Sequence, residues 1–181
     1  MCYIASELYT KGELFYFLAD KGGLPINVCR YYGKQLVNAL RFMHNNGVAH
    51  RDLKCENILL NENYELKISD FGFACPVSGQ TGRGYSNDHV GSNQYMAPEI
   101  QMGVQYQPQT VDWYAFAVIL FMLYSGRAPF VEATLNDPHF KLLAAHDVDR
   151  FWRAHSADKE PGFFSEDFKN LITQLLAYQP F

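Results

Sequence analysis

The chain has 181 residues, of which 48% are hydrophobic, and a formal net charge of -4 at pH 7. Its length suits a single domain, and a negative charge without any basic run excludes the electrostatic signature of a nucleic-acid-binding protein. The longest apolar run, Trp113 to Tyr124, is too short to span a bilayer, so no membrane partner is expected. The four cysteines form no CxxC pair, which argues against zinc and indicates free thiols in a reducing compartment, cytoplasmic or alternatively nuclear.

The first third of the chain predicts short strands and one long helix. Residues 1–9 are expected to form a short strand, and residues 12–20 a short helix. From Pro25 to Asn45, apolar residues recur every three or four positions, which predicts an amphipathic helix. Two short runs at residues 57–60 and 65–68, separated by a turn, predict a small β-hairpin.

The rest of the chain is expected to be mainly helical. Residues 76–94 are rich in Gly, Ser, Asn and Gln and predict a long loop, which in a compact domain is usually functional or mobile. A buried helix is expected over residues 110–125, another after the Asp137-Pro138 cap, a third near residues 146–155, and a last one capped by Ser165. The predicted fold is therefore mostly α with short β-hairpins.

Three short segments carry the strongest functional signal. The first is His50-Arg51-Asp52-Leu53-Lys54-Cys55-Glu56-Asn57. Asp70-Phe71-Gly72 begins thirteen positions after Asn57, and Ala97-Pro98-Glu99 stands further on. In this order the segments resemble the catalytic loop, the metal-binding loop and the end of the activation segment of protein kinases. The resemblance implies the large lobe of a protein-kinase-like fold, which is α+β overall.

The resemblance implies a role for each polar residue of these segments. Asp52 would accept the proton of the substrate hydroxyl, and Lys54 would stabilise charge near the γ-phosphate of ATP. Asn57 and Asp70 would bind Mg²⁺, which prefers oxygen ligands. Ser92, which follows Gly91, would orient Asp52 and Lys54. The implied cofactors are therefore ATP and Mg²⁺. By itself, a lone Asp or Asn in a loop is more often a turn former.

Two of these residues indicate which hydroxyl is phosphorylated. Tyrosine kinases usually carry Arg near the place of Lys54 and Pro where Ser92 stands. The resemblance therefore points to a serine/threonine kinase, with a protein as its substrate.

The beginning of the chain resembles the adenine-binding region of the same family. Glu7 and Tyr9 would offer backbone groups to the base, and Leu59 would form its apolar floor. Glu13 matches an acid near the ribose. Ser6 falls at the gatekeeper position, where a side chain this small is expected to admit purine-like inhibitors with bulky substituents.

Two acids match the residues that bind a basic side chain upstream of the phosphorylated residue. They are Glu13 and Glu56, and Glu56 is also expected to line the nucleotide side of the cleft. Opposite charges would favour basic peptides as substrates. A third acid often found in such kinases is replaced here by Met122.

One acid and two substitutions on the predicted buried helix bear on the catalytic loop. Asp112 resembles the family's Asp that supports the backbone of that loop. Tyr114 and Ala117 stand where the family pattern has Trp and Gly.

The segment from Asp70 to Glu99 has 30 residues and resembles an activation segment. In kinases with an Arg at the position of Arg51, a phosphate on this segment pairs with the Arg, which implies an upstream activating kinase. Asp88 occupies the expected phosphorylated position. The sequence leaves three alternatives open: Asp88 is a weak permanent substitute for a phosphate, Ser86 is the real acceptor, or the loop is flexible and Asp88 is solvated.

The resemblance also suggests that the family's domain is incomplete here. Residues 1–9 would be the last small-lobe strand and the hinge, and residues 10–181 the large lobe, ending before its final helix. No GxGxxG motif and no VAIK-like lysine occur, so the small lobe is expected to be largely absent. The Arg that would pair with Glu99 is expected beyond Phe181. The 181 residues alone are therefore expected to be inactive.

Two rival functions remain open in the sequence. A catalytically dead, kinase-like docking module would keep the lobe but lose the chemistry, and the intact Asp52, Lys54, Asn57 and Asp70 argue against it in part. A small-molecule kinase with the same lobe would not need the Ala97-Pro98-Glu99 end of the segment.

Overall fold

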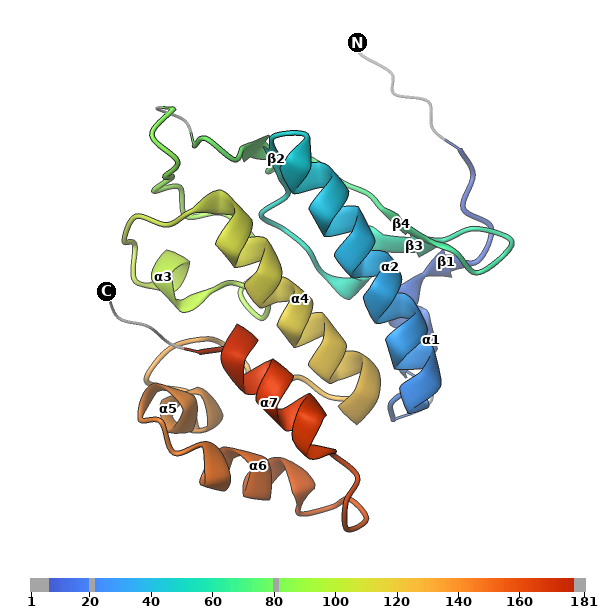
Figure 1. Cartoon of the computed structure of the whole chain (residues 1–181), viewed down its shortest axis with the longest axis vertical. Coiled ribbons are helices and arrows are strands. Elements are labelled where there is room, and N and C mark those ends of the chain that lie inside the picture. Colours follow the sequence, from blue (N-terminus) through green and yellow to red (C-terminus); the bar gives the residue numbers. More distant parts are fainter. Residues whose placement is uncertain (1–6, 20–21, 80–81, 178–181) are drawn as a thin grey trace.

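The structure is a computed structural model of the chain and describes residues 7–19, 22–79 and 82–177. Helices dominate it, as the sequence predicts (Figure 1). The helices are α1 (Leu14–Ala19), α2 (Ile26–Asn45), α3 (Pro98–Gln101), α4 (Pro108–Ser125), α5 (Pro138–Ala144), α6 (Val148–Ser156) and α7 (Glu166–Leu175). A 3-10 turn, Cys55–Asn57, lies within the segment that carries the strongest functional signal.

Short antiparallel strands lie beside α2 and hold two of the functional segments. The strands are β1 (Gly12–Glu13), β2 (Val48–Ala49), β3 (Ile58–Leu60), β4 (Leu66–Ile68) and β5 (Cys75–Pro76). The predicted hairpin is confirmed as β3 and β4, with Leu59 opposite Lys67, and β1 pairs with the other edge of β3. Separately, β2 pairs with β5. The chain between β2 and β3 and the chain between β4 and β5 are therefore each fixed at both ends.

Helix α4 forms the centre of the core. Most of its side chains are apolar and buried, and from Tyr114 to Leu123 all of them are, so this part of the helix can be covered on every side. It contacts α2 and α7, which lie on opposite sides of it in Figure 1. Helix α2 is amphipathic instead, and its buried face includes Leu36, Leu40 and Met43. The centre of the molecule is thus a fixed support on which the polar segments rest.

The predicted helix caps are confirmed. The carboxylate of Asp137 accepts hydrogen bonds from the backbone N–H groups of His139 and Phe140 at 2.8 and 2.9 Å. The hydroxyl of Ser165 accepts one from the N–H of Phe168 at 3.3 Å. These bonds satisfy backbone donors that a helix leaves unpaired in its first turn.

The first residues described differ from the prediction. Residues 7–9 have no regular structure, and residues 1–6, including Ser6, lie outside the described part of the chain. Gly12 and Glu13 form β1, so the helix expected from residue 12 begins only at Leu14. The N–H of Lys11 donates to the carbonyl of Leu60, and this pairing with a distant strand draws the chain out of a helix.

The predicted buried helix is two residues longer than expected, because it begins at Pro108. Proline lacks a backbone N–H and is tolerated in the first turn of a helix. The predicted aromatic pair of α6, Phe151 and Trp152, is buried and packs around Phe121 of α4. Packing therefore accounts for this pair.

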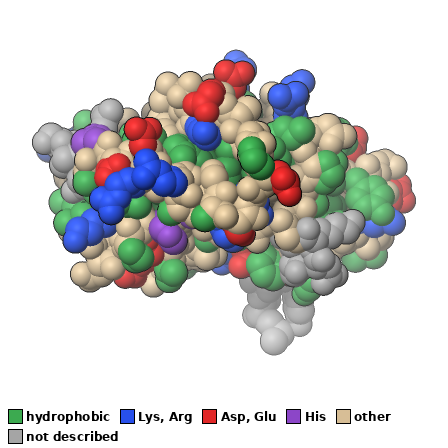
Figure 2. All heavy atoms as spheres, turned by 90° about the horizontal axis from the view of Figure 1, so that it is seen from below, with side chains coloured by type: hydrophobic (Ala, Val, Ile, Leu, Met, Phe, Trp, Pro, Cys, Tyr) green, Lys and Arg blue, Asp and Glu red, His purple; other side chains and the backbone are tan. Residues whose placement is uncertain are grey.

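The surface carries both signs of charge. Figure 2 shows the face seen from below in Figure 1, where Lys and Arg side chains lie beside Asp and Glu. Within the described ranges, no helix has the length and apolar character needed to cross a membrane.

Candidate active site

The loop after β2 is anchored to α4 by Asp112, which is fully buried. Its carboxylate accepts hydrogen bonds from the N–H groups of His50 and Arg51 at 2.9 and 2.8 Å. The same carboxylate lies 2.8 Å from the Nε2 atom of His44 on α2. Arg51 has a φ of 67°, an uncommon value for a residue with a side chain. Through Asp112, helix α4 therefore holds the strained backbone immediately before Asp52. The resemblance gives Asp112 this supporting position.

Asp52, Lys54 and Ser92 form one polar cluster. The Nζ atom of Lys54 donates to Oδ2 of Asp52 at 2.8 Å, and the hydroxyl of Ser92 donates to Oδ1 at 2.8 Å. Lys54 also donates to the Ser92 hydroxyl at 3.0 Å. Asp52 is 4% exposed, so its charge is compensated by neighbours rather than by bulk water. Both carboxylate oxygens point at fixed donors, which sets the orientation of this carboxylate.

Asn57 directly precedes β3 and Asp70 follows β4, so both lie at the open end of the β3–β4 hairpin. The Nδ2 atom of Asn57 donates to the carbonyl of Asp52 at 2.9 Å, so Oδ1 is the side-chain atom that could accept a cation. Ser69, next to Asp70, donates from both its N–H and its hydroxyl to the carbonyl of Asn57, at 2.8 and 3.0 Å. The pairing of Asn57 with Ser69 brings Asn57 and the exposed Asp70 to the same edge of the hairpin.

The donors at this edge suit Mg²⁺. One amide and one carboxylate oxygen are typical of a magnesium site that takes its other ligands from phosphate and water. Among the described residues, no group of three or more His, Cys, Asp or Glu side chains is arranged to hold a metal. A cation here would therefore depend on a bound nucleotide for part of its shell.

The residues predicted to contact adenine lie along β1, β3 and the segment before β1. Glu13 and Leu59 are direct partners across the two strands. Glu7 is exposed, and Tyr9 is partly buried. The carbonyl of Tyr9 accepts a hydrogen bond from the N–H of Gly12 at 3.2 Å. The N–H of Tyr9 is therefore the group that we expect to donate to adenine. The gatekeeper position, Ser6, lies outside the described residues.

Glu56 lies beside a tyrosine that is not among the residues predicted for the site. The hydroxyl of Tyr95 donates to Oε2 of Glu56 at 3.3 Å. Burial, followed by the neighbouring Cys55 and Glu56, raises the pKa of Tyr95, so this hydroxyl remains protonated. Burial also raises the pKa of Cys55 to about 12, which keeps the thiol neutral and unreactive. Only the position of Tyr95 two residues before Ala97-Pro98-Glu99 could have drawn attention to it.

Arg51 reaches away from Asp52 into a second polar cluster. Its Nη1 atom donates to Oδ2 of Asp88 at 2.7 Å, to the Ser86 hydroxyl at 3.1 Å and to the Tyr106 hydroxyl at 3.2 Å. Its Nε atom donates to the carbonyl of Phe73 at 2.8 Å. The structure thus joins the predicted Arg51 and Asp88. The cluster also contains Ser86 and the buried Tyr106, and no sequence pattern marked Tyr106.

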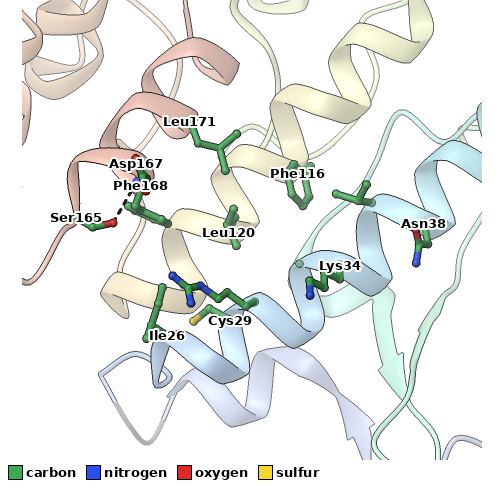
Figure 3. A pocket seen from close by; sticks show the side chains of 13 residues that line it. Ile26, Cys29, Lys34, Asn38, Phe116, Leu120, Ser165, Asp167, Phe168 and Leu171 are labelled. Atoms are coloured by element: carbon green, nitrogen blue, oxygen red, sulfur yellow. Dashed lines mark hydrogen bonds between the residues drawn. The ribbon is translucent and has the colours of Figure 1, made fainter.

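Two hollows lie apart from the cluster of Asp52, Lys54 and Ser92, and the second of them borders Tyr106. A mainly apolar groove of about 470 Å³ runs between α2, α4 and α7, with Phe116, Leu120 and Leu171 along it (Figure 3). A second hollow of about 570 Å³ is lined in part by Glu99 and Tyr114. Burial raises the pKa of Glu99, and among the described residues no ion pair to it is formed. None of the residues predicted to bind nucleotide or metal lines either hollow.

Comparison with known proteins gives one consistent result. The model of the family described as "Protein kinase domain" matches residues 1–181. The chain is 42% identical over 183 residues to serine/threonine-protein kinase chk1 of Schizosaccharomyces pombe, a match that covers 99% of this chain and 34% of that protein. It is 36% identical over 149 residues to testis-specific serine/threonine-protein kinase 2 of Mus musculus, covering 81% and 41%. It is 35% identical over 178 residues to CBL-interacting protein kinase 11 of Oryza sativa, covering 98% and 33%. The chain spans less than half the length of each of these relatives.

Proposed function

Since this chain belongs to the protein kinase domain family, we propose that it supplies the catalytic lobe of a serine/threonine kinase. The reaction is the transfer of the γ-phosphate of ATP to a Ser or Thr hydroxyl of a protein. The observation that carries the proposal is the cluster in which Lys54 and Ser92 both bond the carboxylate of Asp52.

The geometry of this cluster suits a general base and a charge-stabilising cation. As the substrate oxygen bonds to the γ-phosphorus and the bond to ADP breaks, the Asp52 carboxylate takes the hydroxyl proton. Lys54 sits 2.8 Å from that carboxylate and can reach a phosphate next to it. Its positive charge lowers the cost of charge spread over the phosphoryl oxygens. Ser92 keeps the carboxylate facing the substrate.

The proposed metal site lies at the open end of the β3–β4 hairpin. Asn57 Oδ1 and the carboxylate of Asp70 would hold Mg²⁺, which when bound neutralises phosphate charge. The adenine would lie over Leu59, with backbone groups of Glu7 and Tyr9 along its edge and Glu13 near the ribose. Leu59 and Glu13 are paired across β1 and β3, which supports a common surface for the base and the sugar.

The substrate and setting are proposed more coarsely. Glu13 and Glu56 would set two acids near the bound substrate and so favour peptides with basic residues before the acceptor. The 181 residues contain no GxGxxG motif, so we expect these residues alone to transfer phosphate at background rates. We expect a reducing location, the cytoplasm or the nucleus.

The test is a phosphorylation assay on the full-length protein. With ATP, Mg²⁺ and peptides that differ only in Ser, Thr or Tyr, we expect transfer to Ser and Thr. The substitution Asp52→Asn should lower kcat by about 10² to 10⁴-fold, because it removes the proton acceptor. Asp149→Asn, which changes an exposed carboxylate on α6, is the matched control.

Two outcomes would contradict the proposal. Equal transfer by the wild-type and Asp52→Asn proteins would show that Asp52 is not the base. No transfer by the wild-type protein, in either phosphorylated or unphosphorylated form, would favour the docking module.

A further inference from the structure

The second polar cluster connects the catalytic loop to a segment far from it in the sequence. Arg51 directly precedes Asp52, and its guanidinium contacts Ser86 and Asp88. Its side chain is 6% exposed, and that of Asp88 is 27% exposed. A buried guanidinium needs an anion nearby, since an unpaired buried charge is strongly destabilising. Asp88 supplies that anion through a contact of 2.7 Å.

Further hydrogen bonds hold the segment that carries Asp88, and none of them requires a phosphate. Ser86 and Tyr106 exchange backbone hydrogen bonds of 2.8 and 2.9 Å. The Tyr106 hydroxyl donates to the carbonyl of Asp88 at 2.9 Å and accepts from Arg51. Tyr106 is itself buried, only two residues before α4, so it ties the segment to the core.

Ser86, the alternative acceptor of a phosphate, is poorly placed to receive one. It is 3% exposed, and its hydroxyl already contacts Arg51 and Oδ2 of Asp88, at 3.1 and 3.3 Å. A phosphate on Ser86 would bring a second anion against the Asp88 carboxylate and would need room that a buried hydroxyl lacks. In this conformation, the guanidinium of Arg51 already has an anionic partner, the carboxylate of Asp88.

We infer that Asp88 is a built-in anion that fixes Arg51, and through it the catalytic loop, so that the kinase is active without phosphorylation of residues 82–92. This inference rests on the proposed function. Asp88 and Tyr106 are then positioning residues: they act on Asp52 through Arg51 and touch neither nucleotide nor substrate. The other charged or titratable groups that face Arg51 are Cys75 and Tyr106, and Asp112 binds its backbone.

The test uses full-length protein treated with phosphatase, with intact mass confirming that no phosphate remains. We expect the wild-type protein to stay active in this state. Asp88→Asn should lower kcat by about 10- to 100-fold with little change in the KM for peptide, because a charged hydrogen bond is lost while the substrate contacts remain. Asp88→Glu should restore most of the activity, and Asp149→Asn should leave it unchanged.

Two further readouts separate positioning from general stability. In Arg51→Gln, the additional change Asp88→Asn should have almost no effect on kcat, since the two residues act as one unit. Hydrogen–deuterium exchange of residues 82–92 should rise in Asp88→Asn and not in Asp149→Asn, whether or not the protein has kinase activity.

The outcomes that would overturn the inference are distinct from a failure of the proposed function. A wild-type protein that is inactive without phosphate and active once these residues are phosphorylated would overturn it. A kcat of the Asp88→Asn protein equal to that of the wild type would also overturn the inference. If the wild-type protein transfers no phosphate in either state, the proposed function fails. Unchanged hydrogen–deuterium exchange of residues 82–92 in Asp88→Asn would then show that Asp88 does not fix this segment through Arg51 either.

Discussion

At the scale of single residues, the candidate site is built from polar groups that are buried together with their partners. Asp112 accepts hydrogen bonds from two consecutive backbone N–H groups and also contacts His44. Asp52 is bonded through both carboxylate oxygens. Because a buried carboxylate without donors is costly, each bond also restricts where these groups can point. The bonds that make burial tolerable therefore also set the orientation of these carboxylates.

Ser92 offers a direct test of this orientation. Its hydroxyl donates to Asp52 at 2.8 Å and accepts from Lys54 at 3.0 Å. We expect Ser92→Ala to lower kcat by about 10- to 100-fold, because a hydrogen bond to a charged group is worth on the order of 1.5 to 3 kcal/mol. Ser92→Thr keeps the hydroxyl and should retain activity close to wild type. Steady-state kinetics at saturating ATP would measure both, and full activity in Ser92→Ala would refute the role of this hydroxyl.

The sequence could predict these residues only where a motif marks them. Asp52, Asn57 and Asp70 stand at spacings typical of one chemistry, so the order of residues along the chain is enough to propose them. Tyr95 and Tyr106 could not be named in this way, because their partners, Glu56 and Arg51, lie 39 and 55 positions away. No local pattern records such a contact.

At the scale of elements, α4 and the turn before α2 depend on close backbone contact. Helix α4 ends at Ser125 and is capped by Gly126, which has a φ of 78°. A Cβ atom on Gly126 would overlap the backbone of Gly22 and lie 2.6 Å from the N atom of Gly23. The N–H of Leu24 also donates to the carbonyl of Leu123 at 2.7 Å. The end of α4 thus fixes where α2 begins.

We therefore expect Gly126→Ala to lower the free energy of unfolding by about 3 kcal/mol. Left-handed backbone costs a residue with a side chain on the order of 1 to 2 kcal/mol, and the overlap with Gly22 adds to it. Gly162→Ala is the matched control, since Gly162 has a φ of 79° but open space around its Cβ position. It should lose only about 1 kcal/mol. Urea unfolding measures both, and equal losses would show that the backbone contact does not matter.

The elements that the sequence predicted best are those defined by their own residues. The apolar period of α2 and the caps at Asp137 and Ser165 are local features, and each of these predictions is confirmed. β1 was missed because two residues carry no alternation. Its strand character comes from pairing with β3, more than 40 residues away. Local periodicity carries no information about such pairing.

At the scale of the whole molecule, one aromatic cluster joins α4 to α6 and α7. Phe121 of α4 packs against Phe151, Trp152 and Phe164. Trp152 also donates a hydrogen bond to Thr173 of α7 at 3.0 Å. Helices α6 and α7 carry none of the residues predicted for catalysis. They support α4, whose Asp112 holds the backbone of the loop that contains Asp52.

His155 lies in this cluster and should make the fold sensitive to acid. It is 2% exposed, and the centroid of its ring lies 4.5 Å from the ring centroid of Phe151 and 4.8 Å from that of His139. Burial, followed by the charges of His139 and Arg127, lowers its pKa from 6.5 to about 4. The carbonyl of Pro129 and the carboxylate of Asp158 oppose this shift only in part.

The unfolded chain therefore takes up a proton at His155 near pH 6.5, whereas the folded chain does so only near pH 4. The stability that this residue contributes is complete above pH 6.5 and is lost as the pH falls towards 4. We expect the loss to reach about 3 kcal/mol, at 1.4 kcal/mol per unit of pKa difference. His155→Gln should flatten the dependence of the unfolding free energy on pH in this window, measured by urea unfolding at steps from pH 7 to pH 4. His89→Gln, which changes an exposed histidine, is the control. Parallel pH profiles for His155→Gln and the wild type would show that proton uptake at this buried ring does not weaken the fold.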